Sequence, residues 1–229
     1  MRVKICGLRT EEDVDNAVAA GADAVGFLVG QLHTSSDFIL PSTARRFAAR
    51  LPVFVTPVLV THLTDPREII ELIECTGITT VQLHGGTTAE ELALLKEHAG
   101  SDVKFITAIH IVDREGPRPI PGPYCPYTDA FLLDSLNVAE GRVGGTGRTH
   151  DWRISAQLVK ESPRPVILAG GLSPENIEEA IKVVRPYAVD ANSRLKNSDG
   201  ALDKLHARAF VALAKAAFAS LPELSGGEK

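Results

Sequence analysis

Val3-Lys4-Ile5-Cys6-Gly7 is a short, mostly apolar run that ends in a thiol, as expected of a buried strand. Thr10 follows as a predicted N-cap, and the acidic residues 11–13 suit the positive end of a helix dipole. The apolar positions after them have helical spacing and stop at Gly21. The chain therefore opens with a strand and a helix, the unit from which α/β folds are built.

The same unit recurs along the whole chain. Continuous apolar runs typical of parallel strands occupy residues 3–6, 24–29, 53–60, 79–84, 103–109, 130–134, 165–169 and 187–190. Helices are predicted over residues 10–21, 41–50, 65–73, 88–99, 151–160, 173–184 and 202–213. Residues 115–127 are rich in proline and glycine, so an irregular segment is predicted in place of the fifth helix.

Eight strands that alternate with about seven helices match a (β/α)8 barrel. We predict a single TIM-barrel domain over residues 1–229, with a frayed tail at 225–229. A doubly wound sheet is the alternative, but it needs fewer strands and usually carries a GxGxxG turn after the first strand. Here that turn reads Cys6-Gly7-Leu8-Arg9, which favours the barrel.

Composition excludes several kinds of partner. The net charge of -5 has mixed signs, with no basic block and no run long enough to span a bilayer, which argues against nucleic-acid and membrane partners. Cys6, Cys75 and Cys125 are odd in number and form no CxxC, so neither a zinc ribbon nor a disulfide framework is expected. With no visible signal peptide, we predict a cytoplasmic protein with reduced thiols, a monomer or homodimer.

Barrel active sites lie at the C-terminal ends of the strands. Polar or conformationally free residues at those ends are Cys6, His33, His62, His84, Asp134, Gly170, Gly171 and Asp190. Burial would raise the pKa of Asp134 and suit it to general-acid work. Cys6 could act as a base if Lys4 or nearby helix N-termini stabilise its thiolate. An acid and a base on opposite sides of one mouth are what a proton-shuffling isomerase needs.

Two glycine-rich segments are candidates for ligand binding. Gly170-Gly171 precedes a capped helix, where free amides and close backbone approach favour a phosphate, although the glycines could also serve turn geometry alone. Gly144-Gly145-Thr146-Gly147 could be a lid or a ligand-cradling loop.

A set of motifs spread over nearly the whole chain resembles the phosphoribosylanthranilate isomerase family of tryptophan biosynthesis. The motifs are Lys4-Ile5-Cys6-Gly7, Gly21-Ala22-Asp23-Ala24-Val25-Gly26-Phe27, Val81-Gln82-Leu83-His84-Gly85, Leu133-Asp134, Gly144-Gly145-Thr146-Gly147-Arg148-Thr149-His150-Asp151-Trp152, and Leu168-Ala169-Gly170-Gly171-Leu172 with Pro174-Glu175-Asn176. The resemblance implies a (β/α)8 barrel that needs no cofactor and performs an Amadori rearrangement of a small sugar phosphate.

The resemblance also implies residue roles. Asp134 would be the general acid that protonates the furanose ring oxygen, and Cys6 the base that removes the proton from the sugar's C2. We predict substrate contacts at Gln82, His84, Gly145, Gly147 and Asp37, and phosphate contacts at Gly170, Gly171, Asp190, Ser193 and Arg194.

The chain departs from the family in its substrate loops. Where the family has a Ser-Lys-Arg-Tyr-like segment whose arginine meets the anthranilate carboxylate, this chain has Ser35-Ser36-Asp37-Phe38, and an aspartate would repel that carboxylate. The family's Asp-Val-Ser-Ser-Gly-Val-Glu becomes residues 190–196, with Arg194 at the glycine. Arg194 and Lys196 could hold a phosphate as cations, or another anionic group.

Two further interpretations remain open. A paralogue could act on another small phosphorylated substrate, with His33, Asp37 and His62 joining His84 or Asp190 around a divalent metal such as zinc, iron or manganese. Alternatively, the barrel could bind a metabolite or a partner without catalysis. Retention of Cys6 and Asp134 argues against that last interpretation.

Overall fold

The structure, a computed structural model, describes residues 2–30, 32, 35–112, 122–137, 142–143 and 150–222. Eight parallel strands form its centre: β1 (Arg2–Ile5), β2 (Ala24–Leu28), β3 (Thr56–Thr61), β4 (Thr80–Leu83), β5 (Lys104–Val112), β6 (Ala130–Asn137), β8 (Val166–Leu168) and β9 (Ala188–Ala191). They pair in the order β5-β4-β3-β2-β1-β9-β8-β6, and the pairing of β5 with β6 closes the barrel. The two-residue strand β7 (Arg142–Val143) is antiparallel to β6.

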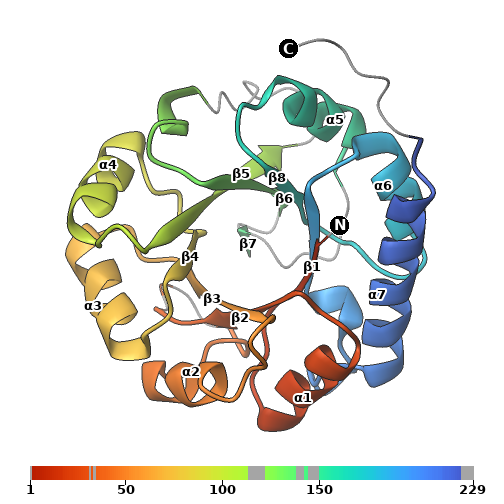
Figure 1. The fold of residues 1–229 in the computed structure, drawn as a ribbon, viewed down its shortest axis with the longest axis horizontal. Helices are drawn as coiled ribbons and strands as arrows, with labels where there is room; N and C mark the ends of the chain where they lie inside the picture. The colour runs from red at the N-terminus through yellow and green to blue at the C-terminus, as the bar shows by residue number, and fades with distance from the viewer. Residues whose placement is uncertain are drawn as a thin grey trace.

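Helices surround the barrel (Figure 1). They are α1 (Glu11–Ala19), α2 (Pro41–Ala48), α3 (Pro66–Thr76), α4 (Ala89–His98), α5 (Trp152–Glu161), α6 (Ile177–Val184) and α7 (Lys204–Ala219), with 3-10 turns η1 (Gly122–Tyr124) and η3 (Ser193–Leu195). The predicted (β/α)8 barrel is thus confirmed. In the described residues, no helix is long and apolar enough to cross a bilayer.

Local chemistry explains where the helices begin. Thr10 and Thr88 form capping boxes with the acidic residue three positions on, and each thus satisfies two backbone amides. Asp151 and Asp203 cap α5 and α7 through their carboxylates. A predicted start differs at α6, which begins at Ile177, after a turn, and not at the Ser-Pro-Glu sequence before it.

Two other boundaries differ from prediction. β3 begins at Thr56 because Val55 N donates to Pro52 O in a turn, which leaves Phe54 94% exposed. β5 continues past residue 109 to Val112. The proline-rich segment contains η1 and a turn in its described part, residues 122–127, as predicted for an irregular connection; residues 115–121 and the tail at 225–229 lie outside the described residues.

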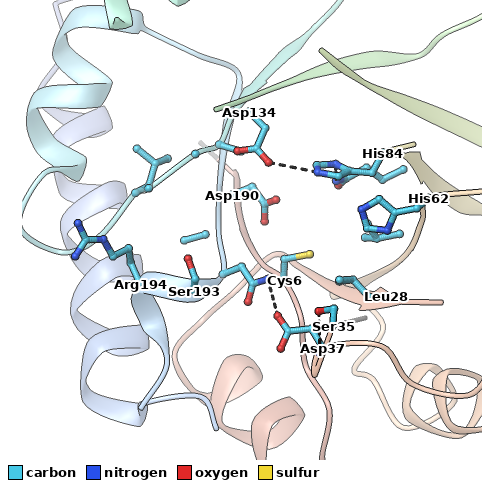
Figure 2. A pocket seen from close by; sticks show the side chains of 18 residues that line it. Cys6, Leu28, Ser35, Asp37, His62, His84, Asp134, Asp190, Ser193 and Arg194 are labelled. Carbon is cyan, nitrogen blue, oxygen red and sulfur yellow. Dashed lines mark hydrogen bonds and ion pairs between the residues drawn. The ribbon is translucent and has the colours of Figure 1, made fainter. Parts of the chain in front are cut away.

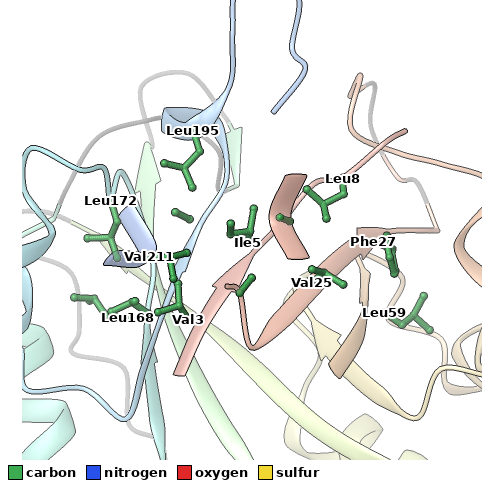
Figure 3. Close-up of a cluster of buried hydrophobic side chains, with 14 of the residues drawn as sticks. Val3, Ile5, Leu8, Val25, Phe27, Leu59, Leu168, Leu172, Leu195 and Val211 are labelled. Atoms are coloured by element: carbon green, nitrogen blue, oxygen red, sulfur yellow. The ribbon is translucent and has the colours of Figure 1, made fainter. Parts of the chain in front are cut away.

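The alternation of side chains along β1 positions the site. Val3 and Ile5 face outward into the main apolar core between strands and helices (Figure 3). Lys4 and Cys6 therefore face the barrel interior, where both are buried. Gly26 on the neighbouring strand makes room for them, since a Cβ there would lie 2.6 Å from Cys6 Sγ. The first strand thus delivers a thiol and an ammonium group to one end of the barrel.

Candidate active site

One pocket at the C-terminal ends of the strands collects most of the predicted site residues (Figure 2). Those that line it are Cys6, Asp37, His62, Gln82, His84, Asp134, Gly170, Gly171, Asp190, Ser193 and Arg194. They come from segments far apart in sequence, because every strand of a parallel barrel ends at the same face. His33, Gly145 and Gly147 lie outside the described residues.

Cys6 is buried at the end of β1, beside the Lys4 ammonium group. Burial raises the pKa of the Cys6 thiol to about 11, although the positive charge of Lys4 acts in the opposite direction. Lys4 Nζ in turn lies 2.8 Å from Asp190 Oδ2 in a buried ion pair. Lys4 does lower the pKa of Cys6, as expected, but desolvation raises this pKa by more. Cys6 is therefore a thiol at neutral pH.

Asp190 was predicted to contact a phosphate, but its carboxylate pairs with Lys4. Its carboxylate accepts the Lys4 hydrogen bond inside the barrel, where a nearby phosphate would meet a negative charge. Its position indicates that it holds Lys4 next to Cys6.

Asp134 is buried in β6, and both of its oxygens have partners. Oδ1 accepts a hydrogen bond from the Ser135 amide at 2.7 Å, and Oδ2 lies 3.4 Å from His84 Nε2. Burial raises the pKa of Asp134, but the hydrogen bond and charge of His84, together with His110, outweigh burial and lower it. The predicted upward shift is therefore wrong. Asp134 is the ionised partner of a carboxylate–imidazole pair, which Gln82 positions through a 3.1 Å contact with His84 Nδ1.

His84 is the middle ring of a row of three histidines. Its centroid lies 5.3 Å from that of His62 and 4.9 Å from that of His110, with both pairs edge to face. His110 was not predicted as a site residue because β5 was expected to end at residue 109. The alternation of β5 continues through His110-Ile111, and that pattern was the signal that could have revealed it.

Asp37 is neutralised by residues that follow β9. Its Oδ1 accepts a hydrogen bond from Lys196 Nζ at 2.6 Å, and its Oδ2 accepts one from Asn192 at 3.0 Å. Lys196 is therefore engaged with a carboxylate, and does not line the pocket beside Arg194 as a phosphate-binding cation. Asn192 was missed, because nothing local relates it to a residue 155 positions earlier.

The glycine pair follows β8 and lines the same pocket as Asp37. Gly170 and Gly171 both have positive φ, at 85° and 65°. A Cβ at Gly170 would lie 2.3 Å from Ser135 Oγ, so this backbone passes directly over the acid-bearing strand. Ser193 and Arg194 of η3 line the same pocket. Glycine is thus required here by both close packing and backbone conformation.

The metal set suggested by the sequence is not the one that forms in the described part of the chain. Asp37 is tied to Lys196 and Asn192, and His62 packs between the rings of Phe38 and His84. Among the described residues, the group with donor atoms close enough for one ion is His84, His110 and Asp134.

The chain is similar to proteins of one family over nearly all of its length. The family model described as N-(5'phosphoribosyl)anthranilate (PRA) isomerase matches residues 3–212. N-(5'-phosphoribosyl)anthranilate isomerase 2 of Methanosarcina mazei is 45% identical over 227 residues, which cover 98% of this chain and 99% of that protein.

Solved structures give the same result. Phosphoribosyl anthranilate isomerase from Thermus thermophilus superimposes with a TM-score of 0.79 at 32% identity, over 94% of this chain and 99% of that one. A phosphoribosyl anthranilate isomerase in complex with reduced 1-(o-carboxyphenylamino)-1-deoxyribulose 5-phosphate has a TM-score of 0.75 at 31% identity, with the same coverage. The resemblance seen in the motifs is confirmed, and the chain belongs to the N-(5'-phosphoribosyl)anthranilate isomerase family.

Proposed function

We propose that this chain isomerises N-(5'-phosphoribosyl)anthranilate to the corresponding aminoketose phosphate, a step of tryptophan biosynthesis, without a cofactor. The observation that carries the proposal is that Cys6 and Asp134 line one pocket whose rim includes the Gly170-Gly171 backbone and Arg194. Such a pocket offers an acid, a base and an anion site to a single small substrate. The family to which the chain belongs and the bound ligand of its solved relative support the same substrate class.

In the proposed reaction, Asp134 and His84 act as one acid. The ring oxygen of the sugar receives a proton as the furanose opens to a Schiff base. Because the pKa of Asp134 is lowered, this carboxylate is ionised at neutral pH and must receive the proton it delivers. His84, 3.4 Å away, is the group placed to supply it. The acid is therefore a pair whose proton is shared, and not an isolated carboxyl.

Cys6 is the proposed base. It takes the proton from C2 of the Schiff base, and the resulting enolamine tautomerises to the ketone. Only the thiolate form of Cys6 can take this proton, and a thiol with a pKa of about 11 is almost entirely protonated at neutral pH, so the base acts from a small thiolate fraction. Lys4 lowers that pKa by its charge, and Asp190 fixes Lys4 in place. We therefore propose Lys4 and Asp190 as positioning residues for the base.

The two anionic ends of the substrate are assigned to different groups of pocket residues. Gly170, Gly171, Ser193 and Arg194 are proposed to hold the phosphate, with amides, a hydroxyl and a guanidinium. The anthranilate carboxylate is proposed to lie towards Asp37, whose charge Lys196 offsets. We further propose that residues 1–229 act as one cytoplasmic domain on this small substrate, as a monomer or homodimer and without a nucleic-acid or membrane partner.

The test is an assay of the purified, metal-stripped protein with phosphoribosylanthranilate, which follows the loss of anthranilate-type fluorescence. We expect turnover that is lost in Cys6→Ala and in Asp134→Ala. Cys75→Ala is the matched control, because Cys75 is an exposed free cysteine. Absence of turnover by the wild-type protein, with activity on other sugar phosphates after addition of Mn²⁺, Fe²⁺ or Zn²⁺, would instead support a metal-dependent paralogue.

A further inference from the structure

Three neighbouring strands bring two imidazoles and a carboxylate together, and two of these groups, His84 and Asp134, line the pocket. His84 follows β4, His110 lies in β5, and Asp134 lies in β6 directly beside His110 in the sheet register. One donor atom from each lies within 4.8 Å of the other two. Figure 2 shows the contact between His84 and Asp134 that forms one side of this triangle.

His110 has the hydrogen bonding of a histidine prepared to bind an ion. Its Nε2 lies 3.2 Å from the backbone oxygen of His84, to which it can donate. Its Nδ1 is buried and has no hydrogen-bond partner. In metal sites the non-ligating nitrogen commonly donates to a backbone carbonyl in this way.

His84 has a matching arrangement. Its Nδ1 lies 3.1 Å from the amide of Gln82, and Gln82 Oε1 is buried without a partner. Exchanging the oxygen and nitrogen of that amide satisfies Oε1 with a hydrogen from Nδ1. In the ion-bound state, His84 Nε2 then offers its lone pair to the ion in place of the proton that it shares with Asp134 in the ion-free pair. The exchanged amide satisfies Gln82 Oε1, and His110 Nδ1 is left as a buried nitrogen with a lone pair and no hydrogen-bond partner.

We propose that His84, His110 and Asp134 form a binding site for a divalent transition-metal ion, with Zn²⁺ as the type case. Two imidazoles and one carboxylate are a ligand set that Zn²⁺ takes, with a fourth position open to water. The bound ion holds the carboxylate of Asp134 and the Nε2 of His84, so it inhibits the isomerase. The inhibition rests on the proposed function, whereas the binding does not.

Binding is tested without activity. Metal-stripped protein is titrated with Zn²⁺ by calorimetry and with Co²⁺ by visible absorption. We expect one ion per chain and the intense visible bands of a low-coordinate Co²⁺ site. His110→Phe keeps the ring but removes the ligand, and should weaken Zn²⁺ binding by more than the roughly 10- to 100-fold that loss of an outer-shell partner costs. His98→Phe, on the exposed end of α4, is the matched control.

Inhibition is tested in the same preparations. Wild-type activity should fall on addition of Zn²⁺ and return with a chelator. The activity that remains in His110→Phe, measured relative to the same variant without metal, should not change on addition of Zn²⁺. If His110→Phe does not fold, His110→Asn takes its place. The proposed site is overturned if the wild-type protein binds no Zn²⁺, or if the His110 variant binds it equally well. It is also overturned if Cys6→Ala loses binding, because the ion would then be bound by the thiol. Metal binding by a chain with no isomerase activity would contradict the proposed function alone.

Discussion

Lys196 Nζ lies 2.6 Å from Asp37 Oδ1, so a cation that follows β9 neutralises a carboxylate that follows β2. Lys196 also donates to the Gly7 carbonyl at 2.8 Å, and Asn192 donates to the other oxygen of Asp37. These contacts join the segments after β1, β2 and β9 at the rim of the pocket. An anionic substrate placed here, as we propose, would therefore meet a carboxylate whose charge is offset by Lys196.

Breaking this pair should cost both stability and affinity. Lys196→Met leaves Asp37 charged and largely buried, and we expect the free energy of unfolding to fall by roughly 3 kcal/mol. KM should rise because the carboxylate now repels the substrate. The double variant Lys196→Met/Asp37→Asn should recover much of both losses in urea unfolding and steady-state kinetics. A double variant no better than Lys196→Met would show that the charge on Asp37 is irrelevant.

Cys6 should make stability depend on pH in the alkaline range. The fold raises the pKa of the thiol from 9.0 to about 11, so the native state binds this proton more tightly than the unfolded chain does. The stabilisation that this proton gives to the native state is fully present below about pH 9 and is lost as the pH rises towards about 11. The free energy of unfolding should change by an amount on the order of 2–3 kcal/mol over this range. Urea unfolding at several pH values should show this slope in wild type and Cys75→Ala, but not in Cys6→Ala.

Removing His84 should alter the pH dependence of turnover. Its hydrogen bond is the largest influence that lowers the pKa of Asp134, so His84→Gln should let burial raise that pKa. The acidic limb of the kcat/KM profile should then move to higher pH, and kcat should fall by roughly 100-fold, as expected when a general acid loses its proton source. His98→Gln is the control. An unshifted profile with lowered kcat would leave His84 a purely structural role.

Arg194 should contribute to binding more than to chemistry. Arg194→Ala removes a guanidinium from the phosphate side of the pocket, and we expect KM to rise about 10- to 100-fold with little change in kcat. Competitive inhibition by inorganic phosphate should weaken in parallel. Arg208→Ala, an exposed arginine of α7, should change neither value. A loss confined to kcat would contradict the assignment of Arg194 to the phosphate.

Gly26 should be intolerant of a single methyl group. A Cβ there would lie 2.6 Å from Cys6 Sγ and 3.1 Å from Lys4 Cε, so Gly26→Ala must displace the base. We expect a lower kcat and a loss of about 1–3 kcal/mol in the free energy of unfolding from overpacking. The double variant Gly26→Ala/Cys6→Ala should regain stability, because the obstructing sulfur is gone. Equal stability of the single and double variants would contradict this explanation.

The elements of the barrel were predictable because their signals are local. The Thr10 and Thr88 caps, the short apolar runs and the proline-rich connection depend on residues a few positions apart. The motifs that indicate the family are also contiguous, which is why Cys6 and Asp134 could be named before any coordinates. Errors arose where local patterns compete: the apolar side chains at 53–55 belong to a turn, and β5 continues to its second histidine.

The sequence by itself determined the order of strands and helices, the family and the two residues proposed for proton transfer. Only the tertiary structure decided how those residues are charged. The raised pKa of Cys6, the lowered pKa of Asp134 and the neutralisation of Asp37 depend on burial and on partners far away in the chain. Desolvation and Coulomb energy vary with distance in space. The number of residues between two groups in the sequence does not give their distance in space, because closure of the barrel brings the ends of all strands to one mouth.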